Sequence, residues 1–169
     1  MAFIVESGTV ISFAEYDDLF ARDSRVIENN ESLTDDVVEE LLIRATERIL
    51  TKLRLTQWWM DYYMRLANQS TYRTRADIPA LDPNKIKDRQ NDFSDLCVYT
   101  ALAEFILPKV ADFGNEEDAE RNKMGYYANK AESLFNELVA VGDWYDFDDD
   151  DTIASLEKEP GNINLKRIR

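Results

Sequence analysis

The stretch Asp35-Asp-Val-Val-Glu-Glu-Leu-Leu-Ile-Arg-Ala-Thr-Glu-Arg-Ile-Leu-Thr-Lys-Leu-Arg54 decides the fold of this chain. Its apolar residues recur every three or four positions, which places their side chains along one face of an α-helix. Thr34 supplies a capping hydroxyl just before two aspartates, and a helix N-terminus favours such negative charges. We therefore predict a helix over residues 35–54. Its buried face is expected to consist of Val38, Leu41, Leu42, Ala45, Ile49 and Leu53.

The segment before this helix predicts a shorter one. Ser12 and Glu15 have the spacing of a capping box, in which the two side chains bond reciprocally to backbone amides. An apolar stripe over residues 13–20 follows at helical spacing. We expect this helix to end near Asp23, because residues 24–33 are polar and typical of a loop.

An aromatic segment after the long helix is expected to form a short helix over residues 57–66, capped by Thr56. Two large aromatic pairs within six residues cannot all face inward, so part of this set is a candidate subunit contact. The alternative is that all four rings belong to the core and keep their hydroxyls at the surface. The four residues are Trp58, Trp59, Tyr62 and Tyr63.

Two further helices are predicted in the second half of the chain. Asp82 followed by Pro83 is typical of a helix start, so a central helix is expected from there to Leu107, where Pro108 follows. The apolar spacing predicts a last helix over about residues 116–141. Together these segments predict an all-α protein, a small helical bundle of four to five helices with extended N-terminal and C-terminal arms.

The charge and hydropathy of the chain limit its partners. With 34 acidic and 20 basic residues its formal net charge is −14, so we do not expect it to bind nucleic acid, whose phosphates need clustered Lys and Arg. A surface of that sign still lets DNA slide past without sticking. No segment approaches the roughly 20 apolar residues that span a bilayer, and no targeting signal is visible. We therefore expect no membrane association and synthesis in the cytoplasm.

The residues that usually carry catalysis are missing from the sequence. There is no histidine, the commonest general base and zinc ligand. Cys97 is the only cysteine, so no internal disulfide can form, and its apolar surroundings favour a buried structural thiol. No glycine-rich phosphate loop or activated serine is present either. We therefore expect that the chain is not an enzyme.

The N-terminal arm is assigned to residues 1–11, and the bundle domain to residues 12–142. The arm alternates weakly between apolar and polar residues and contains the turn signal Ser7-Gly8, which predicts an extended segment with a bend. Phe3 and Val5 in this arm are further candidates for a subunit contact.

The C-terminal arm, residues 143–169, joins an acidic run to a basic end. Residues 143–151 contain six aspartates, while three of the last four residues are basic, so both segments suit oppositely charged surfaces elsewhere. The basic end alternates like a strand that can add to a sheet edge of another subunit, the alternative being a disordered tail. The docking candidates are Ile163, Leu165, Lys166, Arg167, Ile168 and Arg169.

One motif in the acidic run has the ligand spacing of a calcium loop. Its carboxylates stand at the first, third, fifth and twelfth positions, the pattern that wraps one Ca²⁺ ion. The sixth position holds Asp151 in place of the usual glycine, and Pro160-Gly161 follow soon after. A solvated acidic linker is the alternative interpretation. The candidate ligands are Asp146, Asp148, Asp150 and Glu157.

Several of these segments, in this order, resemble the head-to-tail connector proteins, or adaptors, of tailed bacteriophages. The similar segments are Phe3-Ile-Val-Glu-Ser-Gly-Thr9, the stripe from Phe13 to Phe20, Leu41-Leu-Ile-Arg-Ala-Thr-Glu-Arg-Ile49, Trp58-Trp59, the acidic Trp-Tyr-Asp-Phe-Asp stretch with Thr152-Ile153, and the closing Asn164-Leu-Lys-Arg. They are packing and docking patterns, with no catalytic signature among them. Residues 24–33 and 68–83 match no pattern of that family.

The resemblance implies a structural virion protein. Copies of a small helical bundle would form a ring, typically a dodecamer, beneath the portal protein in the neck of the virion, after assembly in the host cytoplasm. The ring would extend the channel through which double-stranded DNA passes without specific binding, and would offer a platform to a neck or tail-completion protein. By analogy, the C-terminal arm would dock on the portal or a neighbour.

Two other classes of function remain open at this point. An acidic regulatory protein that mimics DNA would need carboxylates spread over a rigid face at phosphate-like spacing, whereas here the densest charge lies in one terminal run beside a basic end. A calcium-regulated module would require the acidic loop to become ordered when the ion is added.

Overall fold

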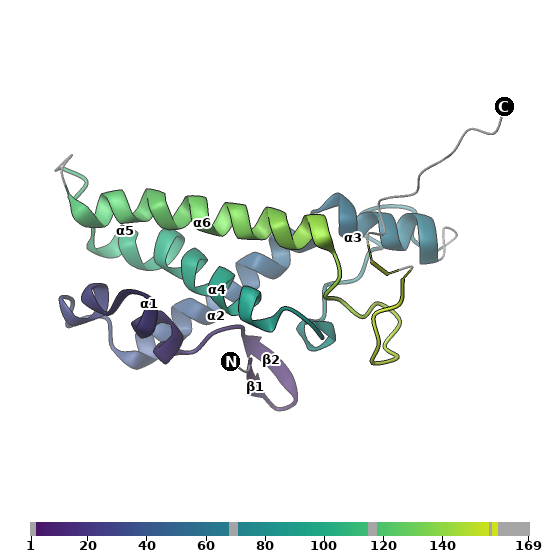
Figure 1. The fold of residues 1–169 in the computed structure, drawn as a ribbon, viewed down its shortest axis with the longest axis horizontal. Coiled ribbons are helices and arrows are strands. Elements are labelled where there is room, and N and C mark those ends of the chain that lie inside the picture. Colours follow the sequence, from purple (N-terminus) through teal and green to yellow (C-terminus); the bar gives the residue numbers. More distant parts are fainter. Residues whose placement is uncertain (1–2, 68–70, 115–117, 156, 159–169) are drawn as a thin grey trace. The chain divides into compact units, whose positions relative to one another are not determined.

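The computed structural model describes residues 3–67, 71–114, 118–155 and 157–158. Within these ranges the chain is predominantly helical and its only sheet has two strands (Figure 1), so the predicted all-α class is confirmed. Two compact units are present, one formed by Met1–Ile49 with Arg89–Glu137 and the other by Leu50–Asp88 with Leu138–Arg169. No helix in the described ranges has an apolar stretch of the length that a bilayer requires.

The N-terminal arm of the first unit is a β-hairpin. Strands β1 (Ile4–Glu6) and β2 (Thr9–Ser12) pair antiparallel, and the turn between them has positive φ at both Ser7 (51°) and Gly8 (83°). Such a turn matches the natural twist of paired strands, because both central residues take the left-handed conformation. The predicted bend at these two residues is therefore confirmed as a hairpin turn.

Helix α1 (Tyr16–Glu28) differs from its predicted bounds at both ends. Its capping box is formed by Glu15 and Asp18, while Ser12 belongs to β2. At Asp23, where an end was expected, the backbone departs from helical geometry (φ −150°, ψ 72°) and then continues to Glu28. The break agrees with the predicted helix end near Asp23, whose carboxylate accepts hydrogen bonds from Lys123 Nζ and Tyr127 Oη, both at 3.0 Å. Residues 24–28, expected to be a loop, are helical.

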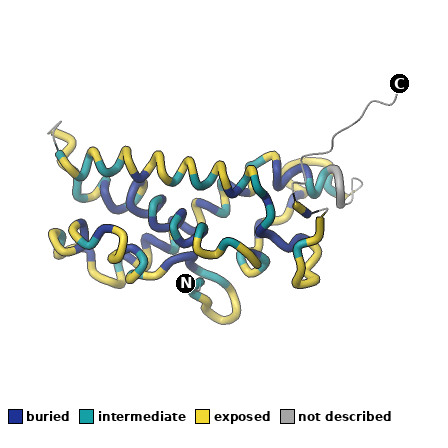
Figure 2. The backbone as a smooth tube through the Cα atoms, viewed as in Figure 1, coloured by how far each residue is buried: buried dark blue, intermediate teal, exposed yellow. Residues whose placement is uncertain are grey.

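Helix α2 (Asp35–Arg54) occupies the range predicted for it. Each residue of its predicted buried face is at most 2% exposed: Val38, Leu41, Leu42, Ala45, Ile49 and Leu53. Figure 2 shows buried positions alternating with exposed ones along this helix. The boundary between the two compact units falls within α2, after Ile49, so the helix contributes residues to both.

A polar contact inside the first unit connects α2 to the end of the hairpin. The backbone amide of Phe13 donates to the Thr46 hydroxyl at 3.0 Å, and the Ser94 hydroxyl donates to the Phe13 carbonyl at 2.6 Å. Cys97 is fully buried beside Thr46, and burial raises the pKa of its thiol to about 11. The cysteine is therefore a structural residue with little thiolate character.

The central helix begins later and ends later than predicted. Asp82 and Pro83 open only the single 3₁₀ turn η2 (Pro83–Lys85), and helix α4 (Gln90–Ala101) starts after Arg89 adopts a left-handed conformation. The proline stop at Leu107 was also wrong. The π-helical segment η3 (Leu102–Ile106) widens the turn ahead of Pro108, so that helix α5 (Leu107–Val110) continues despite the missing proline donor.

The last helix, α6 (Ala119–Val141), ends at Gly142 with φ 60°. A residue without a side chain suits this left-handed position just past a helix end. Tyr127 and Leu138 are its buried residues, and most of the helix is partly or fully exposed (Figure 2).

Replacing Thr46 with valine tests the contact between α2 and Phe13. The substitution keeps the side-chain shape but leaves the buried Phe13 amide without an acceptor, so we expect the free energy of unfolding to fall by about 1–3 kcal/mol in chemical denaturation. Thr9→Val, at an exposed position of β2, is the matched control and should change stability little. Equal stability of the Thr46→Val variant and the wild type would contradict this account.

Candidate functional site in the acidic loop

The second unit holds the acidic run against a framework of aromatic side chains. Helix α3 (Gln57–Asp61) begins at Thr56, whose hydroxyl accepts a hydrogen bond from the Trp59 amide at 3.3 Å, as the sequence predicted. The π-helical segment η1 (Tyr62–Ala67) follows directly. Segment 57–67 therefore presents two tryptophans and two tyrosines along one short helical stretch.

The aromatic residues of the acidic run pack on this stretch. The ring centroids of Trp58 and Trp144 lie 4.6 Å apart, and those of Tyr62 and Phe147 lie 3.8 Å apart in a stacked arrangement. Trp144 is fully buried, and Tyr145 is 1% exposed. Aromatic pairs of this kind contribute beyond the apolar area that they bury. The aromatic residues therefore fix the acidic run on helix α3 and segment η1, and they thereby fix the backbone positions of the aspartates next to them.

The candidate contact residues differ in their accessibility. Trp58 and Trp59 are buried within this unit (6% and 0% exposed), which agrees with a core role, whereas Tyr62 and Tyr63 are half-buried. In the first unit, Phe3 packs on Phe13 with 4.8 Å between ring centroids, while Val5 remains 56% exposed. A subunit contact by any of them stays a prediction, and the docking candidates 163–169 lie outside the described residues.

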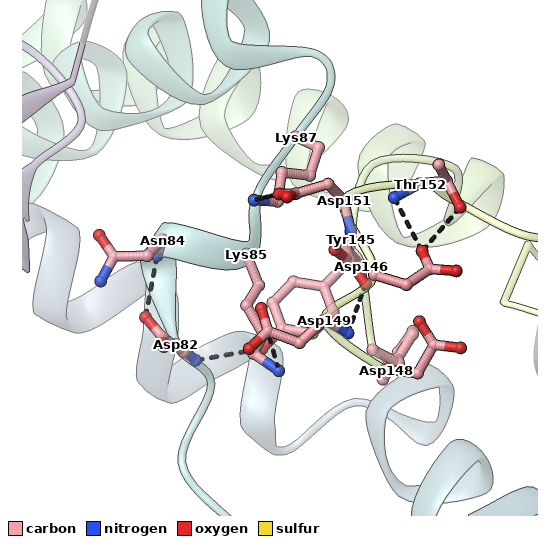
Figure 3. A network of polar contacts seen from close by, with 12 residues as sticks. Asp82, Asn84, Lys85, Lys87, Tyr145, Asp146, Asp148, Asp149, Asp151 and Thr152 are labelled. Atoms are coloured by element: carbon pink, nitrogen blue, oxygen red, sulfur yellow. Dashed lines mark hydrogen bonds and ion pairs between the residues drawn. The ribbon is translucent and has the colours of Figure 1, made fainter.

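Backbone hydrogen bonds fasten the acidic run to the 3₁₀ turn η2 and the residues that follow it. The Lys87 amide donates to the Trp144 carbonyl, and the Asp146 amide donates to the Lys85 carbonyl, both at 3.0 Å. The Tyr145 hydroxyl accepts from the Asp82 amide at 3.2 Å (Figure 3). The start of the acidic loop, defined here as residues 146–157, thus has a specified position relative to η2.

Two buried carboxylates organise the acidic loop through backbone amides. Asp146, fully buried, accepts from the amides of Asp149 (2.7 Å) and Asp151 (2.9 Å) with its two oxygens. Glu157, 3% exposed, accepts with Oε1 from the amide of Phe147 at 2.7 Å. The Asp148 amide also donates to Oε1, and the Ala154 amide donates to Oε2. The first and twelfth positions of the predicted calcium motif therefore close the loop.

Three of the four predicted ligands come together. Carboxylate oxygens of Asp146, Asp148 and Glu157 all lie within 4.8 Å of one another. Asp150 stands outside this group, because its Oδ1 accepts from the Thr152 amide at 2.8 Å and from the Thr152 hydroxyl at 2.6 Å. The structure therefore brings three of the four candidate ligands together and leaves Asp150 apart from them, and ion binding by any of the four stays a prediction.

The missing glycine does not prevent the calcium-like turn. Asp151 has φ 65°, so the sixth position takes the left-handed conformation for which glycine is normally needed. Asp149 has φ 66° as well. Aspartate adopts this region more readily than most residues, since its short polar side chain can bond locally.

The two lysines of the neighbouring turn pair with aspartates outside the converging group. Lys87 Nζ lies 2.7 Å from Asp151 Oδ1, and Lys85 Nζ lies 3.7 Å from Asp149 Oδ1 (Figure 3). Hydrogen bonding to Asp151 raises the pKa of Lys87. Within the described ranges, no ion pair involves the converging carboxylates. Backbone amides are the hydrogen-bond donors to Asp146 and Glu157, and Lys87 acts on Asp146 through its charge, without forming an ion pair with it.

The carboxylates of Asp146, Asp148 and Glu157 repel one another, and this repulsion adds to desolvation in shifting the pKa values of neighbouring groups. Partial desolvation and then the carboxylates of Glu157, Asp150 and Asp146 raise the pKa of Asp148. Burial and then Glu157, Asp148 and Asp146 raise the pKa of the Tyr62 hydroxyl. A divalent cation would relieve this repulsion, and oxygen ligands are what Ca²⁺ prefers. The group Asp146, Asp148 and Glu157 is the candidate site, with Tyr62 in its electrostatic range.

Sequence reasoning did not identify the groups that support this site. Lys85 and Lys87 were unremarkable in the sequence, since only the fold brings η2 against the acidic loop. The alternation of aromatic and acidic residues over 144–148 was the available signal for the anchoring rings. Such alternation predicts the burial of the aromatic side chains, whereas the burial of Asp146 among them depends on the amides of Asp149 and Asp151.

Glu157→Ala tests whether this carboxylate closes the acidic loop. The variant removes the acceptor of three backbone amides, so we expect hydrogen exchange at Phe147, Asp148 and Ala154 to accelerate by roughly 5- to 150-fold, which corresponds to a loss of about 1–3 kcal/mol of local stability. Asp150→Ala is the control, because the Asp150 side chain accepts from Thr152 and from none of these three amides. Unchanged protection of all three amides in the Glu157→Ala variant would disprove the closing role.

Comparison with known proteins identified no relative of this chain. No family model, no curated protein and no solved structure matches the chain. The residues and geometry described above, together with the resemblance in the sequence, are therefore the grounds for a functional assignment.

Proposed function

We propose that this chain is a head-to-tail adaptor of a tailed bacteriophage, a structural virion protein and not an enzyme. The observation that supports the proposal is that two of the segments resembling this family, both within the described residues, pack in the interior of a helical protein. Residues 41–49 supply much of the buried face of α2. Trp58 and Trp59 form the aromatic framework that receives the stretch 144–148.

The proposed place of the protein is the neck of the virion. Copies assemble in the host cytoplasm into a ring, typically a dodecamer, seated beneath the portal protein. The ring extends the DNA channel and provides the attachment platform for a neck or tail-completion protein. A net charge of −14 favours this role, because carboxylates facing a channel repel the DNA phosphates and keep the duplex mobile.

The two chain ends are the proposed docking elements. The acidic loop is anchored on its own unit through Trp144, Tyr145 and Glu157, so it gives the C-terminal segment a defined starting point. The segment 163–169 would dock on the portal or a neighbour through its apolar and basic residues. The N-terminal hairpin carries the exposed Val5 and would contact a neighbouring subunit or the next ring.

A second function, Ca²⁺ binding by the acidic loop, is favoured by a specific observation. The carboxylates of Asp146, Asp148 and Glu157 occupy the first, third and twelfth positions of a calcium-loop spacing and converge within 4.8 Å. The left-handed Asp151 occupies the sixth position. We propose that these three carboxylates, with nearby backbone carbonyls and water, bind the ion. In an adaptor this ion would reinforce the base of the C-terminal arm.

Native mass spectrometry of the chain mixed with the portal protein of the same genome tests the adaptor proposal. We expect a defined complex with one adaptor per portal subunit, and its mass gives the symmetry. Removing residues 158–169 should abolish the complex, because the proposed docking segment is lost, while Glu31→Lys at an exposed site should not. If the chain ignores the portal and instead inhibits a DNA-binding enzyme, it is an acidic DNA mimic.

Calorimetric titration with Ca²⁺ and luminescence titration with Tb³⁺ test the second function. Tb³⁺ bound at the site should be sensitised by Tyr62 and the neighbouring tryptophans. We expect Asp148→Asn to weaken Ca²⁺ binding by at least the roughly 10- to 100-fold that loss of an outer-shell group costs. Asp149→Asn is the matched control, since that residue pairs with Lys85. An absence of heat and of sensitised emission at millimolar ion would leave a solvated acidic linker.

A further inference from the structure

The N-terminal hairpin leaves one strand edge open. Its sheet consists of β1 and β2 alone, so the outer edge of β1 pairs with no strand in the described part of the chain. Glu6 and Thr9 flank the turn and face each other. In such a hairpin the flanking pair exchanges hydrogen bonds, so the N–H and C=O of the next residue, Val5, point toward the outer edge.

The outer edge of β1 is exposed although it carries an apolar residue, Val5. Val5 is 56% exposed, and Glu6 beside it is exposed as well. Native proteins generally protect open edges, because an unpaired strand is a template for another chain. A short apolar edge with one carboxylate at its end therefore suits an extended segment that is apolar and carries a positive charge.

The C-terminal segment of this chain has that chemistry. Residues 3–6 read Phe-Ile-Val-Glu, and residues 163–166 read Ile-Asn-Leu-Lys. In a parallel register Ile163 stands beside Phe3, Leu165 beside Val5, and Lys166 beside Glu6. Apolar side chains then neighbour apolar ones on one face, and opposite charges meet on the other, which are the cross-strand pairs that stabilise a sheet.

The length and charge of the C-terminal segment also suit binding to the β1 edge of another copy. Eleven residues follow Lys158, and an extended chain of that length reaches at most roughly 40 Å. Its last four residues carry Lys166, Arg167 and Arg169. The start of α1, next to the hairpin, adds Asp17 and Asp18 to the negative charge of Glu6.

We propose that the segment 163–169 of one copy adds to the outer edge of β1 in a second copy as a third strand. The proposal rests on the adaptor function, because a ring places copies side by side. Main-chain hydrogen bonds to Val5 supply affinity, and the alternate side chains supply specificity. The hairpin then links each subunit to its neighbour through a segment whose sequence alternates like a strand.

Cysteine cross-linking tests this exchange directly. Val5→Cys and Leu165→Cys are introduced together in the full chain, since the native Cys97 is fully buried and unreactive. Under mild oxidation we expect a ladder of covalent oligomers, alone or with the portal added. Each single-cysteine variant is the control and should give at most a dimer. A cross-linked monomer would mean that the segment pairs within its own chain, and this would overturn the proposal.

A charge exchange tests the register. We expect Glu6→Lys or Lys166→Glu alone to weaken self-association by roughly 5-fold in sedimentation, because like charges then face each other, and the double variant to restore it. Glu31→Lys and Lys158→Glu make the same charge changes at exposed positions outside the pairing and should have little effect. A double variant as weak as the single ones would overturn the parallel register.

The two proposals fail in different ways. A portal complex in native mass spectrometry without a covalent ladder would leave the adaptor function standing and overturn the strand exchange. A ladder without a portal complex would support the exchange and remove the adaptor function on which its biological setting rests. The absence of both would remove both.

Discussion

Burial of the apolar face of α2 is the constraint on which the rest of the structure depends. This helix contributes residues to both compact units, and each of the six positions of its apolar face is nearly inaccessible. Full burial of one Leu or Ile side chain contributes about 1.5–3 kcal/mol. The polar side chain of Thr46 is placed among these positions because it satisfies the buried amide of Phe13. Apolar burial and polar satisfaction are thus provided by the same helix.

The acidic run shows how a segment of like charges can be held in one conformation. Six aspartates within residues 143–151 repel one another. Three kinds of interaction oppose this repulsion: the aromatic anchors of Trp144, Tyr145 and Phe147, the amides that bond to Asp146 and Glu157, and the ion pairs to Lys85 and Lys87. Buried carboxylates persist here because charge-assisted hydrogen bonds satisfy their oxygens.

This arrangement gives the two proposed functions a common physical basis. The converging carboxylates are oriented by amides of the loop that they close, so a cation would find them already in place. The same closure positions the start of the C-terminal segment, on which docking to a portal or to the edge of β1 would depend. Ordering the segment costs entropy that a partner must offset.

By itself the sequence determined the features that depend on local spacing: the all-α class, the bounds and buried face of α2, the cap at Thr56 and the bend at Ser7-Gly8. It also identified Asp146, Asp148 and Glu157, because a ligand spacing is readable along the chain. Each of these follows from interactions between residues close in sequence, where the 3.6-residue helical period and turn preferences act.

Only the tertiary structure decided the features that depend on partners distant in the chain. Lys123 and Tyr127 bond to the Asp23 carboxylate at the break in α1, beyond which the chain is helical to Glu28 where a loop was expected. The helix expected at Asp82 starts only at Gln90, because the intervening residues pair with the acidic run. Lys85 and Lys87 reach Asp149 and Asp151 for the same reason. Local propensities are worth only tenths of a kcal/mol per residue, about 0.7 at most for ordinary residues, so long-range hydrogen bonds and packing override them.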